Sequence, residues 1–439
     1  MATIRLPKVL LDRFTEPFGR FLEIEAASGA VLLFFTVGAL ALSNSPWAHA
    51  FLNVWETETG LLIGPLEFTR SLREWINDAL MTLFFFLVSL ELKRELVLGE
   101  LRSLRMASLS ISASLGGMVV PALLFLMMQA GQPGQQGWGT VMATDTAFVI
   151  GCLALLGSRI PQSLRIFMLS LAIVDDIGAI LVVAFGYSSQ IEWIPLALAA
   201  VGIVLVRTMT LLGVRTFPVY FLMGGLIWLA VDASGVHATI TGVVLGLMTP
   251  ARRWVSDDRL YAILGQVVAH PDGDEDGSGT RDRETLQIAE VAAREALSPV
   301  ERLEIMLHPW VGFVIMPLFA FANAGMTLSL ERLDGALAIA VLVALAIGKP
   351  IGVLAFSWLA VRSGIAARPP DLSWAAVTGG GLLAGIGFTM ALFIANLSFD
   401  QSLIESAKLG IFLASTVSAV AGLALLTRVT SGRRRPAFE

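Results

Sequence analysis

Long apolar runs alternate with short polar stretches along almost the whole chain. A helix needs about 20 mostly apolar residues to cross the hydrocarbon core of a bilayer. By that rule we identify twelve candidate spans, several of them short, at residues 26–45, 73–92, 106–129, 138–157, 166–187, 193–206, 216–231, 236–249, 308–328, 335–361, 373–398 and 407–427. The pattern predicts an all-α integral membrane protein with about twelve transmembrane helices.

Local signals mark two helix starts and one turn. The tetrapeptide SLRE at 71–74 has the serine–glutamate spacing of a capping box, at the start of the second span. The tetrapeptide SPVE at 298–301 predicts another helix start, which leads into the ninth span. Between the first two spans, the stretch 47–72 contains Gly60 and a Gly-Pro pair at 64–65, which together predict a β-hairpin.

The distribution of basic residues orients the spans. If the N-terminus is cytoplasmic, 25 of the 30 lysines and arginines fall in inward-facing loops. The outward loops carry four basic residues (Arg70, Arg73, Arg332 and Lys408), and Lys349 lies inside a span. The positive-inside rule therefore predicts that both termini are cytoplasmic.

The spans divide the chain into membrane and cytoplasmic parts. We expect a cytoplasmic N-terminal segment at 1–25, spans one to eight within 26–250, a long acidic cytoplasmic loop at 251–307, spans nine to twelve within 308–427 and a basic cytoplasmic tail at 428–439. The polar, glycine-containing middle of the long loop predicts disorder or loose helix. The N-terminus lacks the basic-then-apolar layout of a signal peptide, so we expect it to be retained.

Composition agrees with a membrane protein and excludes several other classes. Hydrophobic residues make up 56% of the chain and charged residues 15%, with a mean hydropathy of +0.76, whereas soluble proteins average about 25% charged residues. The single cysteine, Cys152, excludes an internal disulfide and is expected to be a small core residue. The sequence has no zinc-ligand spacing and no phosphate-binding glycine loop, so no cofactor is expected. It has no basic patch that would favour nucleic acid.

Four ionisable residues fall deep inside predicted spans: Asp145, Asp175, Asp176 and Lys349. A charge at the centre of a bilayer costs at least about 2.5–3.5 kcal/mol, so such residues usually serve a function, although a buried ion pair can also simply fix packing. The two adjacent aspartates diverge by about 100° around a helix. One can therefore face a charged partner while its neighbour faces an aqueous cavity. Lys349 needs a carboxylate partner or must lose its proton; snorkelling to the interface is the alternative.

Two predicted spans contain residues that favour a break in the helix. The segment TVMATDTAFVIG includes Thr144 and Asp145, and the segment GGGLLAGIGFTMALF carries five glycines. Close helix packing is the alternative explanation for the glycines, because broken backbone at membrane depth survives only in protein or beside a cavity. If both helices break and cross, Asp145 could offset the positive half-helix ends and Lys349 the negative ones.

These motifs resemble those of the bacterial NhaA-type sodium/proton antiporters, over nearly the whole chain. The matching stretches are FFFLVSLELKRELVLGEL (84–101), ATDTAFVIGCLALLGSRIP (143–161), LAIVDDIGAI (171–180), GVHATITGVVLG (235–246), LHPWVGFVIMPLFAFANAG (307–325), GKPIG (348–352) and GIGFTMALFIANLSF (385–399). The resemblance implies two inverted repeats, spans three to five (about 106–187) and ten to twelve (about 335–427), with spans four and eleven broken where they cross.

The resemblance also implies an activity and a location. Members of the family are transporters rather than enzymes, without a cofactor. They export Na⁺ or Li⁺ in exchange for more than one proton per cation, so that transport is electrogenic, and they respond to pH. The resemblance implies a multi-pass protein of the bacterial inner membrane, surrounded by membrane lipids, with no nucleic-acid partner. It also implies a homodimer, joined partly through the outward hairpin around 50–70.

The resemblance assigns roles to individual residues of this sequence. Asp175 and Asp176 match the ion-binding, proton-carrying aspartate pair. Asp145 and Lys349 match the residues that compensate the opposed helix ends, and Lys349 also matches the partner of the first aspartate. Thr144 matches a residue that lines the cation site, so Na⁺ or Li⁺ would contact Asp176, Asp175 and Thr144.

Further residues match positions linked to pH response or to a cytoplasmic funnel: Glu91, Glu95, His237 and Glu304. Glu91 and Glu95 could equally be solvated charges near a span end, and a lone histidine is more often structural. The chain departs from the family at Ile305, where a histidine can occur, and in the length of the loop before the ninth span. Both departures affect the pH set-point rather than transport itself.

Three functions of other classes also involve charged residues in a membrane. An intramembrane aspartyl protease needs two aspartates that converge from separate helices, whereas these two are adjacent on one helix. A sodium-gated channel or sensor could use the same residues without alternating access. A symporter for an organic substrate would need a roomier polar pocket. We expect competition between proton and cation for a buried aspartate, while the second proton is carried by either Asp175 or Lys349.

Overall fold

A computed structural model describes residues 25–63, 66–97, 99, 104–187, 191–214, 216–251, 259, 261–263, 287–290, 292, 297–327 and 334–431. Residues 1–24 of the predicted N-terminal segment, most of the loop 251–307 and most of the tail 428–439 lie outside these residues. The described chain is helical apart from one hairpin, as the apolar pattern predicts.

The first part of the chain carries the hairpin and the helices α2 to α11, several of them short. In order, these elements are α2 (Glu25–Ser43), α3 (Ala48–Trp55), β1 (Glu58–Ile63), β2 (Leu66–Ser71), α4 (Leu72–Trp75), η1 (Ile76–Leu80), α5 (Met81–Val97), α6 (Leu104–Met128), η3 (Pro133–Val141), α7 (Thr146–Leu156), η4 (Gly157–Arg159), α8 (Gln162–Gly186), α9 (Trp193–Leu211), α10 (Phe217–Ala233) and α11 (Ile240–Met248). The second part carries α14 (Pro299–Trp310), η5 (Val311–Ile315), α15 (Met316–Asn323), α16 (Gly335–Val343), η7 (Ala344–Gly348), α17 (Lys349–Arg362), α18 (Trp374–Ala384), α19 (Phe388–Ser398) and α20 (Gln401–Ser431).

Both predicted capping boxes are confirmed. The Ser71 hydroxyl accepts the Glu74 N–H at the start of α4, and the Glu74 carboxylate accepts the Ser71 N–H. Ser298 and Glu301 make the same reciprocal pair at the start of α14, with Pro299 at the first helical position. These contacts satisfy N–H groups that the first turn of a helix leaves without partners.

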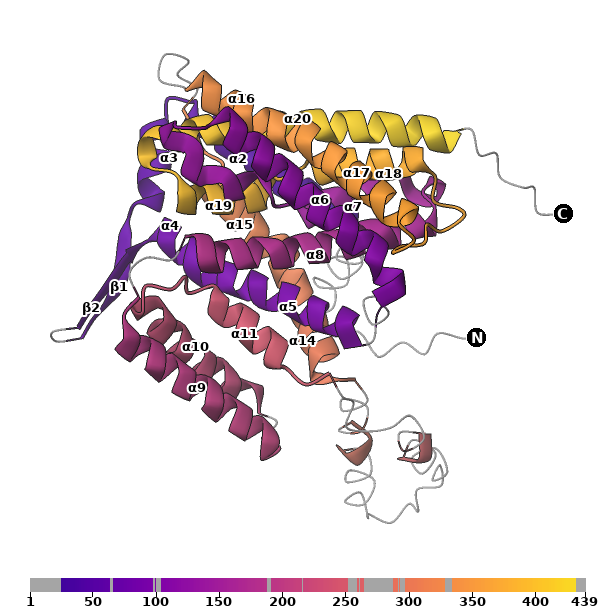
Figure 1. Ribbon diagram of the computed structural model, residues 1–439. Helices are drawn as coiled ribbons and strands as arrows, with labels where there is room; N and C mark the ends of the chain where they lie inside the picture. Colours follow the sequence, from indigo (N-terminus) through magenta and orange to yellow (C-terminus); the bar gives the residue numbers. More distant parts are fainter. Residues whose placement is uncertain are drawn as a thin grey trace, which may run out of the picture.

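The predicted hairpin is also present. β1 and β2 pair antiparallel, from Glu58 opposite Ser71 to Ile63 opposite Leu66, while the turn at 64–65 lies outside the described residues. Figure 1 shows the hairpin projecting from one end of the helical bundle, which we call the hairpin end. Arg70 fixes its base, since the guanidinium forms ion pairs with Asp78 of η1 and with Asp232 of α10.

The structure supports part of the predicted number of spans. Among the described residues, seven helices are long and apolar enough to cross a membrane, or nine if each of two bent helix pairs counts as one span. The remaining three predicted spans coincide with the shorter helices α2, α10 and α11. Hydropathy alone therefore supports seven to nine spans, and twelve remains a prediction.

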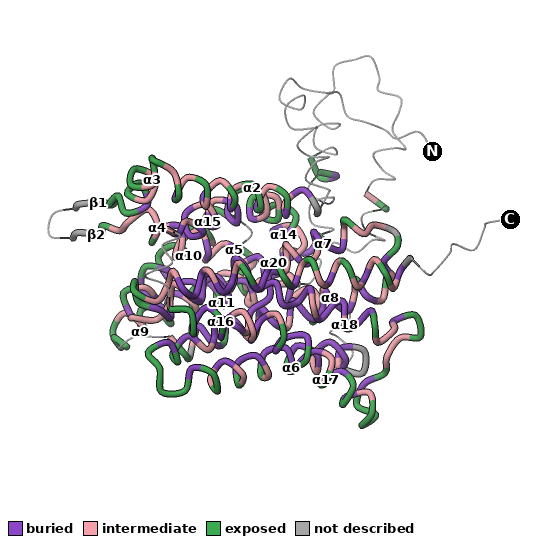
Figure 2. Tube along the Cα trace, turned by 90° about the horizontal axis from the view of Figure 1, so that it is seen from above, coloured by how far each residue is buried: buried purple, intermediate pink, exposed green. Residues whose placement is uncertain are grey.

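The helices form a bundle with a buried interior and an apolar exterior. In Figure 2, buried segments run through the middle of the bundle, whereas much of α9 at its edge is exposed. The exposed side chains of α9 are largely apolar and include Ile194, Leu198 and Leu211. Exposed apolar surface on this scale is expected where a helix faces lipid rather than water.

Close backbone contact joins α6 to α17. A Cβ atom added to Gly352 would lie 2.0 Å from the Gly116 carbonyl oxygen, and one added to Gly116 would lie 2.2 Å from the Gly352 oxygen. Only glycine permits this approach. The contact places the beginning of α17, and therefore Lys349, directly beside α6.

Candidate ion-binding site

Two helices break inside the bundle, at the segments where the sequence predicts breaks. The axes of η3 and α7 differ by 45°, and those of α18 and α19 differ by 44°. The first break spans residues 142–145 and the second spans 385–387. The two breaks touch each other, because the Asp145 N–H donates to the Ile386 carbonyl at 2.7 Å.

Asp145 caps two half-helices at once. It is the N-cap of α7, where Oδ1 accepts the Phe148 N–H at 3.1 Å. Oδ2 accepts both the N–H of Thr389 at 2.9 Å and its hydroxyl at 2.5 Å, in the first turn of α19. The carboxylate is buried and meets two positive helix ends, as predicted for this residue.

Lys349 faces the opposite end of the first half-helix. The residue is fully buried, and its ammonium donates to the carbonyl of Met142, which follows the last residue of η3. The same ammonium lies 3.1 Å from Asp175 Oδ2. The predicted carboxylate partner is therefore Asp175, and the predicted compensation of a negative helix end is found at η3.

Thr144 provides the corresponding contact at the other broken helix. Its hydroxyl lies 3.1 Å from the carbonyl of Ala384, the last residue of α18, and 2.5 Å from Asp175 Oδ2. A hydroxyl has one hydrogen to donate, so the two acceptors share it. The oxygen of Thr144 thus sits between the broken helix and the aspartate, where a cation ligand is expected.

Asp175 is fully buried and is contacted by three donors. Besides Thr144 and Lys349 on Oδ2, the hydroxyl of Ser114 on α6 donates to Oδ1 at 2.5 Å. Ser114 is a site residue that the sequence prediction missed. Three side chains from other parts of the chain therefore donate to this one carboxylate, and one of them carries a positive charge.

Asp176 has very different surroundings. It is 4% exposed, and its only hydrogen bond among the described residues comes from the Thr146 hydroxyl at 3.3 Å to Oδ2. Oδ1 is buried and has no hydrogen-bond partner in this part of the chain. A buried carboxylate oxygen without a partner is costly, unless the group takes up a proton or a cation.

The predicted pH-response and funnel residues lie in two other places. Arg94 on α5 forms ion pairs with Glu304 on α14 and, at 3.4 Å, with Glu95; Glu91 lies one turn earlier on α5. The sequence prediction did not include Arg94, which joins the acidic residues.

His237 belongs to neither the aspartate pair nor the Arg94 cluster. It precedes α11, and its Nε2 lies 2.8 Å from the carbonyl oxygen of Tyr187 at the end of α8. The phenol of Tyr187 accepts the Gly139 N–H and donates to the Gln136 carbonyl, both in η3. The histidine is therefore connected to the first broken helix through one tyrosine.

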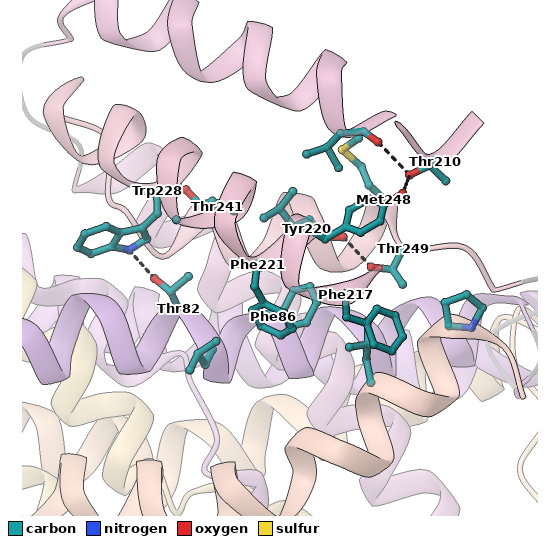
Figure 3. A pocket seen from close by; sticks show the side chains of 18 of the residues that line it. Thr82, Phe86, Thr210, Phe217, Tyr220, Phe221, Trp228, Thr241, Met248 and Thr249 are labelled. Carbon is teal, nitrogen blue, oxygen red and sulfur yellow. Dashed lines mark hydrogen bonds between the residues drawn. The ribbon is translucent and has the colours of Figure 1, made fainter. Parts of the chain in front are cut away.

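A cavity of about 390 Å³ lies apart from all these residues, between α5, α10, α11 and α14. Figure 3 shows aromatic side chains around it, including Phe86, Phe217 and Tyr220, and Trp228 donating to the Thr82 hydroxyl. Its lining is mainly apolar and includes none of the predicted site residues. The cavity is therefore separate from the candidate site at the broken helices.

Comparison with known proteins identifies the family of the chain. The sequence model of a family described as Na⁺/H⁺ antiporter 1 matches residues 19–426. The chain is 60% identical over 434 residues to the Na(+)/H(+) antiporter NhaA 3 of Acidiphilium cryptum (strain JF-5), which covers 99% of this chain and 95% of the relative. It is 57% identical over 431 residues to the Na(+)/H(+) antiporter NhaA of Rhizobium meliloti (strain 1021), with 98% and 99% covered. On both grounds, the chain belongs to the NhaA family of Na⁺/H⁺ antiporters.

Proposed function

We propose that this protein exchanges cytoplasmic Na⁺, or Li⁺, for external protons across the bacterial inner membrane, at a site formed by Asp175 and Asp176. The observation that carries the proposal is the contrast between the two aspartates. Asp175 is held by three donors, whereas Asp176 has a buried oxygen without a partner. Asp176 is therefore the residue that takes up a proton or a cation.

Ligand chemistry supports a hard cation at this position. Ions such as calcium and magnesium prefer oxygen ligands, and sodium behaves similarly. Among the described residues, no group of three or more His, Cys, Asp or Glu side chains could hold a metal ion. The two aspartates therefore need further oxygens, which Thr144 and the carbonyl groups at the helix breaks supply.

Competition at Asp176 is sufficient for coupled exchange. A carboxylate in this position favours either a proton or a sodium ion, and alternating exposure to the two faces converts that competition into antiport. The second proton is carried by Asp175 or by Lys349, depending on whether their ion pair opens when sodium binds. Each net charge moved gains about 2.3 kcal/mol per 100 mV, so an inside-negative potential drives sodium out.

Repeated architecture supports alternating access. The same order of a long helical segment, a broken pair and a second long helix occurs twice. In the first series these are α6, η3 with α7, and α8; in the second they are α16 to α17, α18 with α19, and α20. Such inverted repeats with broken helices at the membrane midplane are found in transporters that rock around a central site. In this arrangement the two broken helices cross at the ion site.

The setting of the transporter follows from its charges and its hairpin. Both termini are cytoplasmic, the hairpin end faces outward, and the hairpin around 50–70 joins two copies into a homodimer among membrane lipids. Glu91, Glu95, Glu304 and His237 adjust the response to pH. The Arg94 ion pairs link Glu304 on α14 to α5. The contact with Tyr187 links His237 to the end of α8.

Substitution of Asp176 by asparagine tests the proposal most directly. Asp176→Asn should abolish sodium-induced proton movement in proteoliposomes, because the amide neither releases a proton nor offers a charged ligand. The measurement is the change in internal pH on adding sodium, lithium or potassium at several external pH values. Retained exchange at normal sodium affinity would overturn the assignment.

Thr416→Ala is a suitable control, since that hydroxyl bonds within its own helix, α20. It should leave exchange unchanged. If sodium flux through the wild-type protein continues when the counter-gradient is removed, the protein is a channel rather than an antiporter.

A further inference from the structure

Three asparagines from distant parts of the chain form a continuous series of hydrogen bonds at the hairpin end. The Asn323 amide donates to Asn77 Oδ1 at 2.7 Å and to the Phe319 carbonyl at 3.0 Å. Asn396 in turn donates to Asn323 Oδ1 at 3.0 Å. Both the nitrogen and the oxygen of the central amide are therefore engaged.

The central amide is fully buried among apolar helices. Burying an amide costs free energy unless it is hydrogen-bonded, and an apolar side chain would fill the same space. Asparagine both donates and accepts, so it can link two neighbours in a defined direction. The hydrogen bonds therefore form in only one relative position of the three elements. Apolar side chains at the same places would allow the elements to shift along one another.

One of the three asparagines lies on a helix that carries the ion site. Thr389, in the first turn of α19, binds Asp145 through its N–H and its hydroxyl. Asn396 follows seven residues later on the same helix, about two turns or 10 Å away and on nearly the same face. A displacement of α19 therefore moves the support of Asp145 and the asparagine contact together.

The other two asparagines lie on elements outside the broken-helix region. Asn77 belongs to η1, a π-helical turn at the beginning of α5, and Asn323 ends α15. α15 packs mainly on α2 and also contacts η1, whereas α19 packs on η3 and α20. The bond between Asn396 and Asn323 is thus a point where the site-bearing helices meet the remaining helices.

We propose that the Asn396–Asn323 hydrogen bond closes the hairpin end of the transport pathway. The bond forms while the ion site is open to the opposite face, and it breaks when α19 moves to open the hairpin end. Asn396 is a positioning residue, which acts through α19 and Thr389. The inference rests on the exchange function proposed above and identifies one contact that biases its two states.

Replacing Asn396 by alanine tests the closure. The variant should shift the equilibrium toward the state that is open at the hairpin end. Apparent sodium affinity should therefore weaken at the opposite face and strengthen at the hairpin face. Removing one hydrogen bond should change the ratio of the two KM values by roughly 2- to 10-fold. The measurement compares sodium-dependent proton movement in everted and right-side-out vesicles.

Two further variants separate this effect from a general loss of structure. Asn77→Ala removes the other end of the series without altering α19, and it should shift the KM ratio in the same direction; it also serves if Asn396→Ala does not insert. Asn44→Ala is the matched control. It removes an amide bond to the Met326 carbonyl near the end of α15, without involving α19, and should leave the ratio unchanged.

The possible outcomes are distinct. An unchanged KM ratio in correctly inserted Asn396→Ala protein overturns the closure, and so does an equal loss of affinity at both faces, because that indicates a structural role only. If the wild-type protein shows no sodium-driven proton movement at either face, the proposed function itself fails. Wild-type exchange with an unchanged ratio in the variants overturns the closure alone.

Discussion

Two adjacent residues of one helix, Asp175 and Asp176, have very different contacts at the candidate site. The sequence predicts that Asp175 and Asp176 diverge and that one meets a charged partner, and the structure confirms the partner as Lys349. Ser114 was not predictable in the same way. Hydroxyl groups in apolar helices often bond to a carbonyl four residues earlier, as Thr36 and Thr416 do. A serine within a span therefore gives no signal until the neighbouring helices are placed.

The ion pair between Lys349 and Asp175 leads to a prediction about stability. Lys349→Ala should destabilise the protein by about 3–5 kcal/mol, because it leaves a buried carboxylate without its charged partner. Adding Asp175→Asn should restore much of that loss, since the amide carries no charge to compensate. The measurement is the thermal unfolding of purified single and double variants in detergent. Additive losses would show that the pair is not energetically coupled.

At the scale of elements, the breaks in the helices were predictable and the π-helical turns were not. Glycines and a polar Asp145 segment reveal where backbone leaves the helix, and the capping boxes show where helices begin. Three π-helical turns, η1, η5 and η7, interrupt α-helical runs, and one of them directly precedes Lys349. Such a turn inserts one residue into the hydrogen-bond pattern and has no characteristic composition, so the sequence does not reveal it.

The contact between α6 and α17 also leads to a prediction. Gly352→Ala should destabilise the protein by about 1–3 kcal/mol, because the new methyl group meets the Gly116 carbonyl and forces the two helices apart. Transport should fall as well, since Lys349 and Ser114 lie on these helices. Gly225→Ala in α10 is the matched control, as no heavy atom lies within 4 Å of the added Cβ. Thermal unfolding of both variants checks the difference, and equal behaviour would contradict it.

At the scale of the whole molecule, composition identifies the membrane class, and helix length with hydropathy supports seven to nine of the twelve predicted spans. The helices α2, α10 and α11 coincide with three further predicted spans but are too short to meet the length criterion. The apparent length of a span depends on its tilt and on the thickness of the local bilayer, which packing determines rather than composition. The asparagine series is likewise invisible in sequence, because its members are more than 70 residues apart.

The hairpin provides a prediction at this scale. Deleting residues 60–69 should convert the proposed dimer into single copies, because the deletion removes most of both strands while it keeps Arg70 and its ion pairs at the base. Exchange should persist, since the ion site lies within one copy. The mass in detergent, measured by light scattering, checks the first point, and proteoliposome exchange checks the second. An unchanged mass would place the dimer contact elsewhere.

The shared carboxylate of Asp145 makes the two halves of the molecule unequal. Asp145 is the N-cap residue of α7 itself. By contrast, α19 has Gly387 as its N-cap without a side-chain hydrogen bond, and its first turn is bonded by Asp145 from the other half. A fragment that contains only the second half would lack this acid, while the first half would keep it. The dependence is mutual at the other helix end, because η3 of the first half is met by Lys349 of the second. Neither break is therefore complete until the two halves have packed together.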